Sequence, residues 1–214
     1  LSEVDIRLVS LQGGSKHNAI PRETEAVILV KAQDAASVEK KIAECGQWFA
    51  TELRSSDADV RVEFEVLSSL PSRMLSQGAT GNVIRYVYLL INGVISMSMD
   101  IQGLVESSLN LGVITTNKDS IQFISSIRSS VRSLKEELYN RVAVTAKLMG
   151  GSVVTEADYP EWAYNPDSKI RVICEDVHEK MYGKKPHITA IHAGLECGLF
   201  TEKFDQMDAI SLGP

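Results

Sequence analysis

The side chains with the clearest chemical potential lie near the C-terminus, in a segment where two glycines surround a carboxylate and a thiol. Gly194 and Gly198 flank Glu196 and Cys197, and a β-branched run at residues 187–191 precedes them. A strand that runs into a glycine-containing loop often carries substrate-binding groups, because glycine permits a close approach of the backbone. The spacing therefore predicts a substrate-binding loop, and it is equally compatible with a strand-to-helix turn that holds a buried cysteine.

An amide and a guanidinium elsewhere in the chain are further candidates for substrate binding. Asn18 lies between a glycine pair and a proline in GGSKHNAIPRE, residues 13–23, and an amide can donate to a carbonyl or carboxylate oxygen without carrying charge. Arg128 closes an alternating strand, and a guanidinium can bind a carboxylate through two parallel hydrogen bonds. Arg132 is a competing candidate one helical turn later. The alternatives are an asparagine that satisfies its own turn and a surface cation.

Metal-ligating side chains do not gather at the spacings that zinc sites require. The four histidines are His17, His178, His187 and His192. None of them forms an HxH, HxD or HExxH pattern. Glu175, His178 and Glu179 share a helix face, but a solvated face explains them better than a ligand set. Metal chemistry is therefore not readable from the residues of this chain alone, and they indicate no metal ligand.

Composition narrows the class of protein. The chain has 214 residues, of which 44% are hydrophobic, enough for one large or two small domains with a core. A net charge of -6 argues against a nucleic-acid partner, because phosphate binding needs a basic face. No apolar run is long enough to span a membrane. The three cysteines are widely spaced and form no CxxC pair, which favours the reducing cytoplasm.

Residue periodicity predicts an α+β protein with an antiparallel sheet. The predicted strands cover residues 4–11, 23–31, 60–66, 109–115, 120–126 and 152–157, and the predicted helices cover 35–54, 80–91 and 131–149. The first two strands form one hairpin, and the strands at 109–115 and 120–126 form another. Asp34 is the expected N-cap of the first helix. This order predicts a ferredoxin-like (split βαβ) domain with helices on one face of the sheet.

A change in composition near residue 160 predicts a domain boundary. Residues 159–166, YPEWAYNP, contain two prolines and three aromatic residues. Beyond them we expect a helix at 168–182 and strands at 188–191 and 209–212, as in a partial α/β domain. The domains predicted are thus 1–160 and 161–214. Both ends of the chain have the character of cut ends, so we expect a piece of a longer protein.

Three motifs resemble those of one enzyme family. HAGLECGLF at residues 192–200, GGSKHNAIPRE at 13–23 and ESSLNLGV at 106–113 are similar to segments of the aminoacyl-histidine dipeptidases (Xaa-His dipeptidases, peptidase D). These are dinuclear zinc enzymes of the superfamily that includes carboxypeptidase G and aminoacylase. The resemblance covers nearly the whole chain. It implies that 1–160 is a lid or dimerisation domain, incomplete at its N-terminus, and that 161–214 is part of the catalytic domain.

The resemblance also implies an activity for the whole protein: hydrolysis of Xaa-His dipeptides, carnosine-like, by a zinc-activated water. Two zinc ions, replaceable by manganese or cobalt, would be bound by residues outside this chain, so the isolated chain is expected to bind no metal and to be inactive. The expected partners are the dipeptide and a second copy of the chain, through the lid. The alternatives are a non-catalytic ferredoxin-like dimerisation or small-ligand-binding module and an amino-acid-sensing domain.

The same resemblance implies roles for four residues. Asn18 would reach the substrate from the lid, and Arg128 would hold the C-terminal carboxylate of the dipeptide. Gly194 and Glu196 would form a wall beside the metals. From its charge, Glu196 could receive the free amino group of the substrate, and a structural salt bridge is the competing role.

Overall fold

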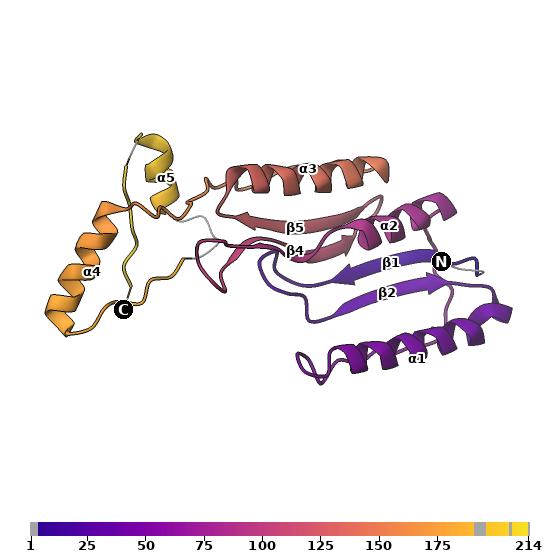
Figure 1. Ribbon diagram of the computed structural model, residues 1–214. Coiled ribbons are helices and arrows are strands. Elements are labelled where there is room, and N and C mark those ends of the chain that lie inside the picture. The colour runs from indigo at the N-terminus through magenta and orange to yellow at the C-terminus, as the bar shows by residue number, and fades with distance from the viewer. Residues whose placement is uncertain (1–3, 191–195, 206, 214) are drawn as a thin grey trace.

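A five-stranded antiparallel sheet and five α-helices make up the described chain, residues 4–190, 196–205 and 207–213 of the computed structural model (Figure 1). The strands are β1 (Arg7–Gly13), β2 (Thr24–Leu29), β3 (Gly93–Met97), β4 (Val105–Thr116) and β5 (Ile121–Ser129). The helices are α1 (Ala35–Glu52), α2 (Gln77–Leu89), α3 (Arg132–Leu148), α4 (Lys169–Tyr182) and α5 (Glu196–Lys203), with a 3-10 turn, η1 (Ala32–Asp34), before α1. The fold is α+β, as the sequence predicts.

Strand β4 is the centre of the sheet because it has neighbours along both edges. One edge pairs with β5 along nearly its whole length. On the other edge, β3 pairs with the first half of β4 as far as Leu109, and β1 meets the second half at Ile114. Strand β2 pairs with β1 at the far side. The edge of β4 between Leu109 and Ile114 is thus left for side chains and loops.

Helices α2 and α3 cover one face of this sheet. The buried core there consists of Tyr86, Leu90, Leu109, Val142 and Ala146. Leu109 of β4 is only 1% exposed, and Leu111, Phe123 and Ile127 pack against the cluster. Successive side chains of a strand point to opposite faces. Residues Ser108, Asn110, Ser126 and Arg128 therefore lie on the other side of the sheet, which we call the polar face.

Both predicted hairpins and the predicted helices of the first part are present. β1 pairs with β2, and β4 pairs with β5 through a turn in which Asn117 N donates to Ser120 O at 2.8 Å. The three helices differ from the prediction only near their ends. Asp34 occupies the predicted N-cap position of α1, but its side chain makes no capping hydrogen bond. Its predicted capping role is wrong.

The predicted strand at residues 60–66 is also wrong, although its alternation is the clearest in the sequence. A strand needs a neighbour for its backbone groups. In the described chain this segment has one backbone hydrogen bond of its own, from Val60 N to Asp57 O. It lies instead against α1, where a Cβ added to Gly46 would come within 3.3 Å of Val62 Cβ. Contact with a helix has replaced sheet pairing.

Three shorter predicted strands are not strands either. Residues 152–157, 188–190 and 209–212 have no ladder partner in the described chain, and Ile191 lies outside the described residues. Each is a short apolar run with strand-like composition. Such a run forms a strand only when a neighbouring strand can pair with it through backbone hydrogen bonds.

The C-terminal part is anchored around the start of α4. Ser168 Oγ accepts from Arg171 N at 3.1 Å, and Asp208 Oδ2 accepts from Ile170 N at 3.0 Å. The hydrogen bond from Ile170 N–H lowers the pKa of the Asp208 carboxyl below its usual value. Gly183, with φ 70°, ends the helix in a left-handed conformation. The predicted helix at 168–182 is confirmed, while the domain boundary at 160 stays a prediction.

None of the described helices is both long enough and apolar enough to cross a membrane.

Candidate functional site

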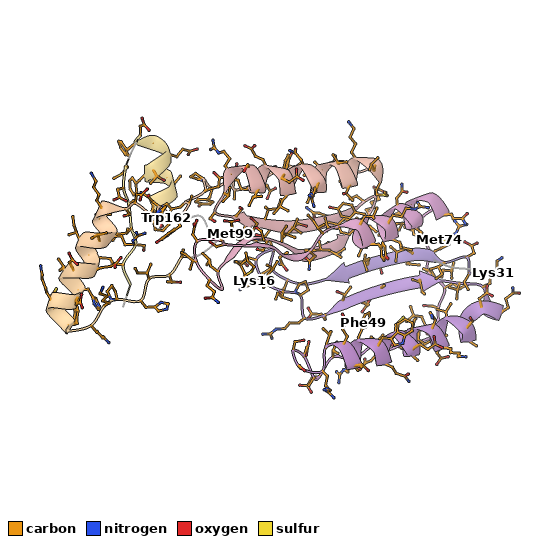
Figure 2. All side chains as sticks on the ribbon, in the orientation of Figure 1. Lys16, Lys31, Phe49, Met74, Met99 and Trp162 are labelled. Atoms are coloured by element: carbon orange, nitrogen blue, oxygen red, sulfur yellow. The ribbon has the colours of Figure 1, made fainter. Side chains whose placement is uncertain are left out.

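Asn18 lies on an exposed turn between β1 and β2. Ala19 N donates to Lys16 O at 3.3 Å, so Asn18 is the third residue of a β-turn over residues 16–19, which we call the Asn18 turn. The approach to this turn requires glycine, because Gly14 has φ +67° and a Cβ there would overlap the carbonyl oxygen of Gly112. In Figure 2, Lys16 lies at the end of the sheet nearer the C-terminal part, on the same side as Trp162.

The GGSKHNAIPRE and ESSLNLGV motifs meet at this turn. Asn110 Nδ2 donates to His17 O at 3.0 Å and to Ala19 O at 2.8 Å. Gly112 provides the space, since a Cβ there would lie 2.5 Å from His17 O. The turn thus occupies the edge of β4 that no strand covers. The side chain of Asn92 occupies another part of this edge, where its Oδ1 accepts from Leu111 N at 2.8 Å.

Arg128 shares the polar face with Asn110. The register places Arg128 opposite Ser108 and places Asn110 opposite Ser126, so Asn110 and Arg128 are diagonal neighbours. Arg128 is exposed, and within the described ranges it forms no ion pair. β5 ends near the end of the sheet that carries the Asn18 turn (Figure 1). The fold therefore brings Asn18 and Arg128 to one face and one end of the sheet.

Arg132 is committed to other partners. Its Nε lies 3.3 Å from Glu161 Oε2, and its Nη2 lies 3.1 Å from Glu202 Oε1 of α5. The hydrogen bond to Glu161, together with the two carboxylate charges, raises the pKa of Arg132 above its usual value. A guanidinium already paired with two carboxylates is a poor receptor for a third. This pairing favours Arg128 over Arg132 as the carboxylate-binding residue.

Lys135 completes an ionic cluster between α3 and the C-terminal part. Its Nζ lies 2.8 Å from Asp158 Oδ1 and also contacts Glu161, whose side chain is 9% exposed. Burial alone would raise the pKa of Glu161, but the hydrogen bonds from Lys135 and Arg132 outweigh it, so that pKa is lowered. Burial would lower the pKa of Lys135, but hydrogen bonds to Asp158 and Glu161 raise it instead. The cluster links the first turn of α3 to residues 158–161 and, through Arg132, to α5.

The lowered pKa of Glu161 predicts a pH dependence of stability. Glu161 stabilises the fold above its ordinary pKa of 4.5, and that stability is lost as the pH falls through the lowered folded value. The urea concentration at the unfolding midpoint of the whole wild-type protein is expected to fall between about pH 5 and about pH 3. In Glu161→Gln this fall is expected to be smaller. Glu137→Gln is the matched control, because Glu137 pairs with Arg141 within α3 and both side chains are more than half exposed. If the urea midpoint of Glu161→Gln falls with pH as steeply as that of wild type, Glu161 is not the source of this pH dependence.

The C-terminal glycine segment differs from the prediction. Gly194 and His192 lie outside the described residues. Glu196 is the exposed first residue of α5, so Glu196, Cys197 and Gly198 belong to a helix and not to a loop. A carboxylate is favourable in the first turn of a helix. Gly198 is buried because α5 approaches residue 160 closely, and a Cβ there would lie 2.9 Å from Pro160 O.

The described chain does not gather a metal site. No group of three or more His, Cys, Asp or Glu residues that could hold an ion occurs among residues 4–190, 196–205 and 207–213. The Glu175–His178–Glu179 helix face has structural partners: Arg171 Nε lies 3.4 Å from Glu175 Oε1, and His178 Nδ1 lies 2.8 Å from Lys184 O. The described residues therefore do not fit a dinuclear zinc centre.

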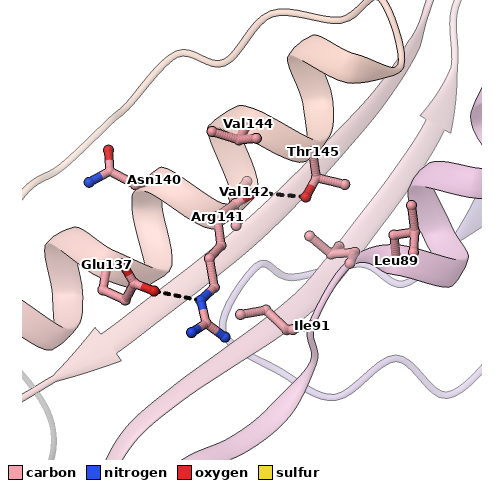
Figure 3. Close-up of a pocket in the computed structure, with 9 residues that line it drawn as sticks. Leu89, Ile91, Glu137, Asn140, Arg141, Val142, Val144 and Thr145 are labelled. Carbon is pink, nitrogen blue, oxygen red and sulfur yellow. Dashed lines mark hydrogen bonds and ion pairs between the residues drawn. The ribbon is translucent and has the colours of Figure 1, made fainter.

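A shallow groove between α2 and α3 has a volume of about 340 Å³ but does not resemble a catalytic site (Figure 3). Leu89, Ile91 and Val144 give it an apolar lining. Its one carboxylate, Glu137, pairs with Arg141 at 2.7 Å. No histidine or cysteine is among the residues that line it. The groove and the polar face are separate features.

Asn110 is the functional candidate that reasoning from the sequence missed. It belongs to the ESSLNLGV motif, yet an asparagine in a predicted strand carries no evident role. The sequence offered one signal, namely that GGSKHNAIPRE and ESSLNLGV each contain an asparagine and a glycine. It did not show that the two motifs are in contact.

Comparisons with known proteins support the resemblance. No family model matches the chain. A cytosol non-specific dipeptidase of Escherichia coli (strain K12) is 30% identical over 212 residues, which cover 99% of this chain and 44% of that protein. The crystal structure of an aminoacylhistidine dipeptidase from Vibrio alginolyticus matches with a TM-score of 0.91 and 36% identity, over 99% of this chain and 43% of that one. The predicted resemblance is therefore confirmed: this chain is a homologue, in sequence and in fold, of a segment that makes up less than half of such dipeptidases.

Proposed function

We propose that the whole protein is a metal-dependent dipeptidase in which this segment covers the substrate. The observation that carries the proposal is the joint placement of Asn18 and Arg128 at one end of one sheet face, within a fold that matches a dipeptidase. An amide donor and a free guanidinium at one site suit a small substrate with a peptide carbonyl and a terminal carboxylate.

In this proposal each residue has a distinct task. Arg128 binds the C-terminal carboxylate of the dipeptide through two parallel hydrogen bonds. Asn18 donates from its amide to an oxygen of the substrate. Glu196, at the start of α5, would face the free amino group, and Gly194 would line the same wall. The exposure of Asn18 and Arg128 and the commitment of Arg132 to Glu161 and Glu202 support these assignments.

The surface of the chain supports its role as part of a larger enzyme. It exposes 15918 Å², whereas a folded monomer of this mass exposes about 9,800 Å². Helix α4 has no buried residue, and its apolar Ile173 and Met181 are 60% and 67% exposed. We propose that the remainder of the catalytic domain covers α4 and provides the metal ligands, since the described residues do not form such a set.

Other features of the proposal draw on the names of the relatives and on the family resemblance of the sequence. The name of the Vibrio alginolyticus protein supports Xaa-His dipeptides as substrates, and we propose carnosine-like dipeptides among them. The name of the Escherichia coli protein supports a cytoplasmic location. We propose two zinc ions, replaceable by manganese or cobalt, and a homodimer formed through the lid. The isolated 214-residue chain is proposed to be inactive.

Removal of metal tests the proposed function. The whole enzyme is expected to lose all hydrolysis of an Xaa-His dipeptide when treated with a chelator and to regain it with zinc, manganese or cobalt. A non-chelating isomer of the same compound is the control and should leave the rate unchanged. Activity that survives the chelator would rule out metal dependence. Absence of dipeptide hydrolysis by the untreated, metal-loaded enzyme would rule out the dipeptidase assignment itself.

A further inference from the structure

We infer that Asn110 is a positioning residue for Asn18: its side-chain amide fixes the Asn18 turn over the polar face of the sheet. The inference rests on the proposed function, in which Asn18 contacts the substrate. It adds a residue that does not touch the substrate but determines where Asn18 points.

The geometry of the contact carries the inference. A side-chain amide has two N–H donors on one nitrogen. Asn110 Nδ2 uses them on His17 O at 3.0 Å and on Ala19 O at 2.8 Å, the carbonyl groups of the residues on either side of Asn18. The 17–18 peptide unit before Asn18 and the 19–20 peptide unit after Ala19 are thus held at a single atom. With two carbonyls fixed, rotation of the backbone at Asn18 is restricted in both directions.

The turn has little else to hold it. Residues 15–20 are exposed, and among the residues that the structure describes the one backbone hydrogen bond within the turn is the 3.3 Å contact from Ala19 N to Lys16 O. Asn110, by contrast, belongs to the central strand β4, beside Leu109, which is 1% exposed in the core. A rigid strand therefore presents the amide to an exposed turn. Support of this kind preorganises a functional side chain.

Polarity makes Asn110 specific for this task. Both partners are carbonyl oxygens, so the side chain must donate twice from one point. Aspartate has the same shape but only acceptor oxygens, which would repel both carbonyls. Gly112 and Gly14 bring the turn close enough for a side chain as short as asparagine, since a Cβ at either position would meet backbone atoms.

A matched pair of isosteric substitutions in the whole enzyme tests the inference. Asn110→Asp removes both donors, whereas Asn92→Asp keeps the oxygen that accepts from Leu111 N at the same edge of β4. Each adds one negative charge near the turn. Asn110→Asp is expected to lower kcat/KM for an Xaa-His dipeptide about tenfold or more, and Asn92→Asp is expected to leave it near wild type. If Asn110→Asp fails to fold, Asn110→Ser, which removes the amide without adding charge, takes its place.

Coupling to Asn18 separates positioning from a general structural role. In an Asn18→Ala background, Asn110→Asp is expected to cause no further loss of kcat/KM, because the group that it positions is already absent. Amide hydrogen exchange at residues 15–20 is expected to speed up in Asn110→Asp and not in Asn92→Asp. The exchange result does not depend on catalysis.

The outcomes distinguish this inference from the proposed function. If Asn18→Ala keeps wild-type kinetics, the substrate role proposed for Asn18 fails, while the exchange data still decide whether Asn110 fixes the turn. If Asn18→Ala lowers kcat/KM but Asn110→Asp has wild-type kinetics or wild-type exchange, the inference is overturned. The inference is also overturned if the fold reductions in kcat/KM of Asn18→Ala and Asn110→Asp multiply in the double variant.

Discussion

Arg128→Ala is expected to lower kcat/KM of the whole enzyme for a dipeptide about 30-fold, which corresponds to about 2 kcal/mol of transition-state binding. The reason is that a carboxylate desolvated in the site would lose its only proposed cationic partner. Arg128 is exposed on the polar face and, in the part of the chain that the structure describes, free of ion pairs. Its guanidinium is thus available to a substrate.

A change of substrate isolates this contact. With a dipeptide amide, which lacks the carboxylate, wild type and Arg128→Ala are expected to give similar kcat/KM values. Arg132→Ala is the control, since its guanidinium contacts Glu161 and Glu202, and it is not expected to discriminate between the acid and the amide. If Arg128→Ala lowers kcat/KM equally for the acid and the amide, Arg128 does not bind the carboxylate. A loss of kcat/KM in Arg132→Ala that is confined to the acid would assign the contact to Arg132.

Gly112→Ala is expected to displace the Asn18 turn and to lower both stability and activity. The new Cβ would lie 2.5 Å from His17 O and 2.6 Å from His17 Cα, and backbone atoms cannot turn aside as a flexible side chain can. Overpacking of this kind costs about 2 kcal/mol in the free energy of unfolding, and we expect kcat/KM to fall about tenfold. Urea denaturation and steady-state kinetics measure the two effects.

Gly78→Ala provides the matched control for that substitution. Gly78 lies in the first turn of α2, where an added Cβ has no heavy atom within 4 Å. Alanine favours a helix more than glycine does, so this variant is expected to be as stable as wild type or slightly more stable. Wild-type stability and kinetics for Gly112→Ala would show that the turn tolerates movement and does not depend on a close approach.

The hairpins and long helices were predictable from sequence because local rules determine them. The turn at Asn117 forces β4 and β5 to pair, and the stripe of α3 with Leu138, Val142 and Ala146 buried has helical spacing. The segment at residues 60–66 obeys the alternation rule equally well but has no strand neighbour. Pairing is a tertiary property, and alternation alone cannot supply it.

The candidate site was predictable in its parts but not in its assembly. Sequence singled out Asn18 and left Arg128 and Arg132 as alternatives. The register that places Arg128 and Asn110 on one face, and the carboxylates that occupy Arg132, are contacts between segments far apart in the chain. Gly198 was misassigned for a related reason. A glycine that reads as a loop signal serves instead for the close packing of a helix against Pro160.

The measurement that tests the account most directly is a crystal structure of the whole, metal-loaded enzyme with a non-hydrolysable dipeptide analogue. The account predicts that the Asn18 amide and the Arg128 guanidinium each lie within about 3 Å of an oxygen of the bound analogue. An analogue bound at the metals with neither side chain directed toward it would contradict the account.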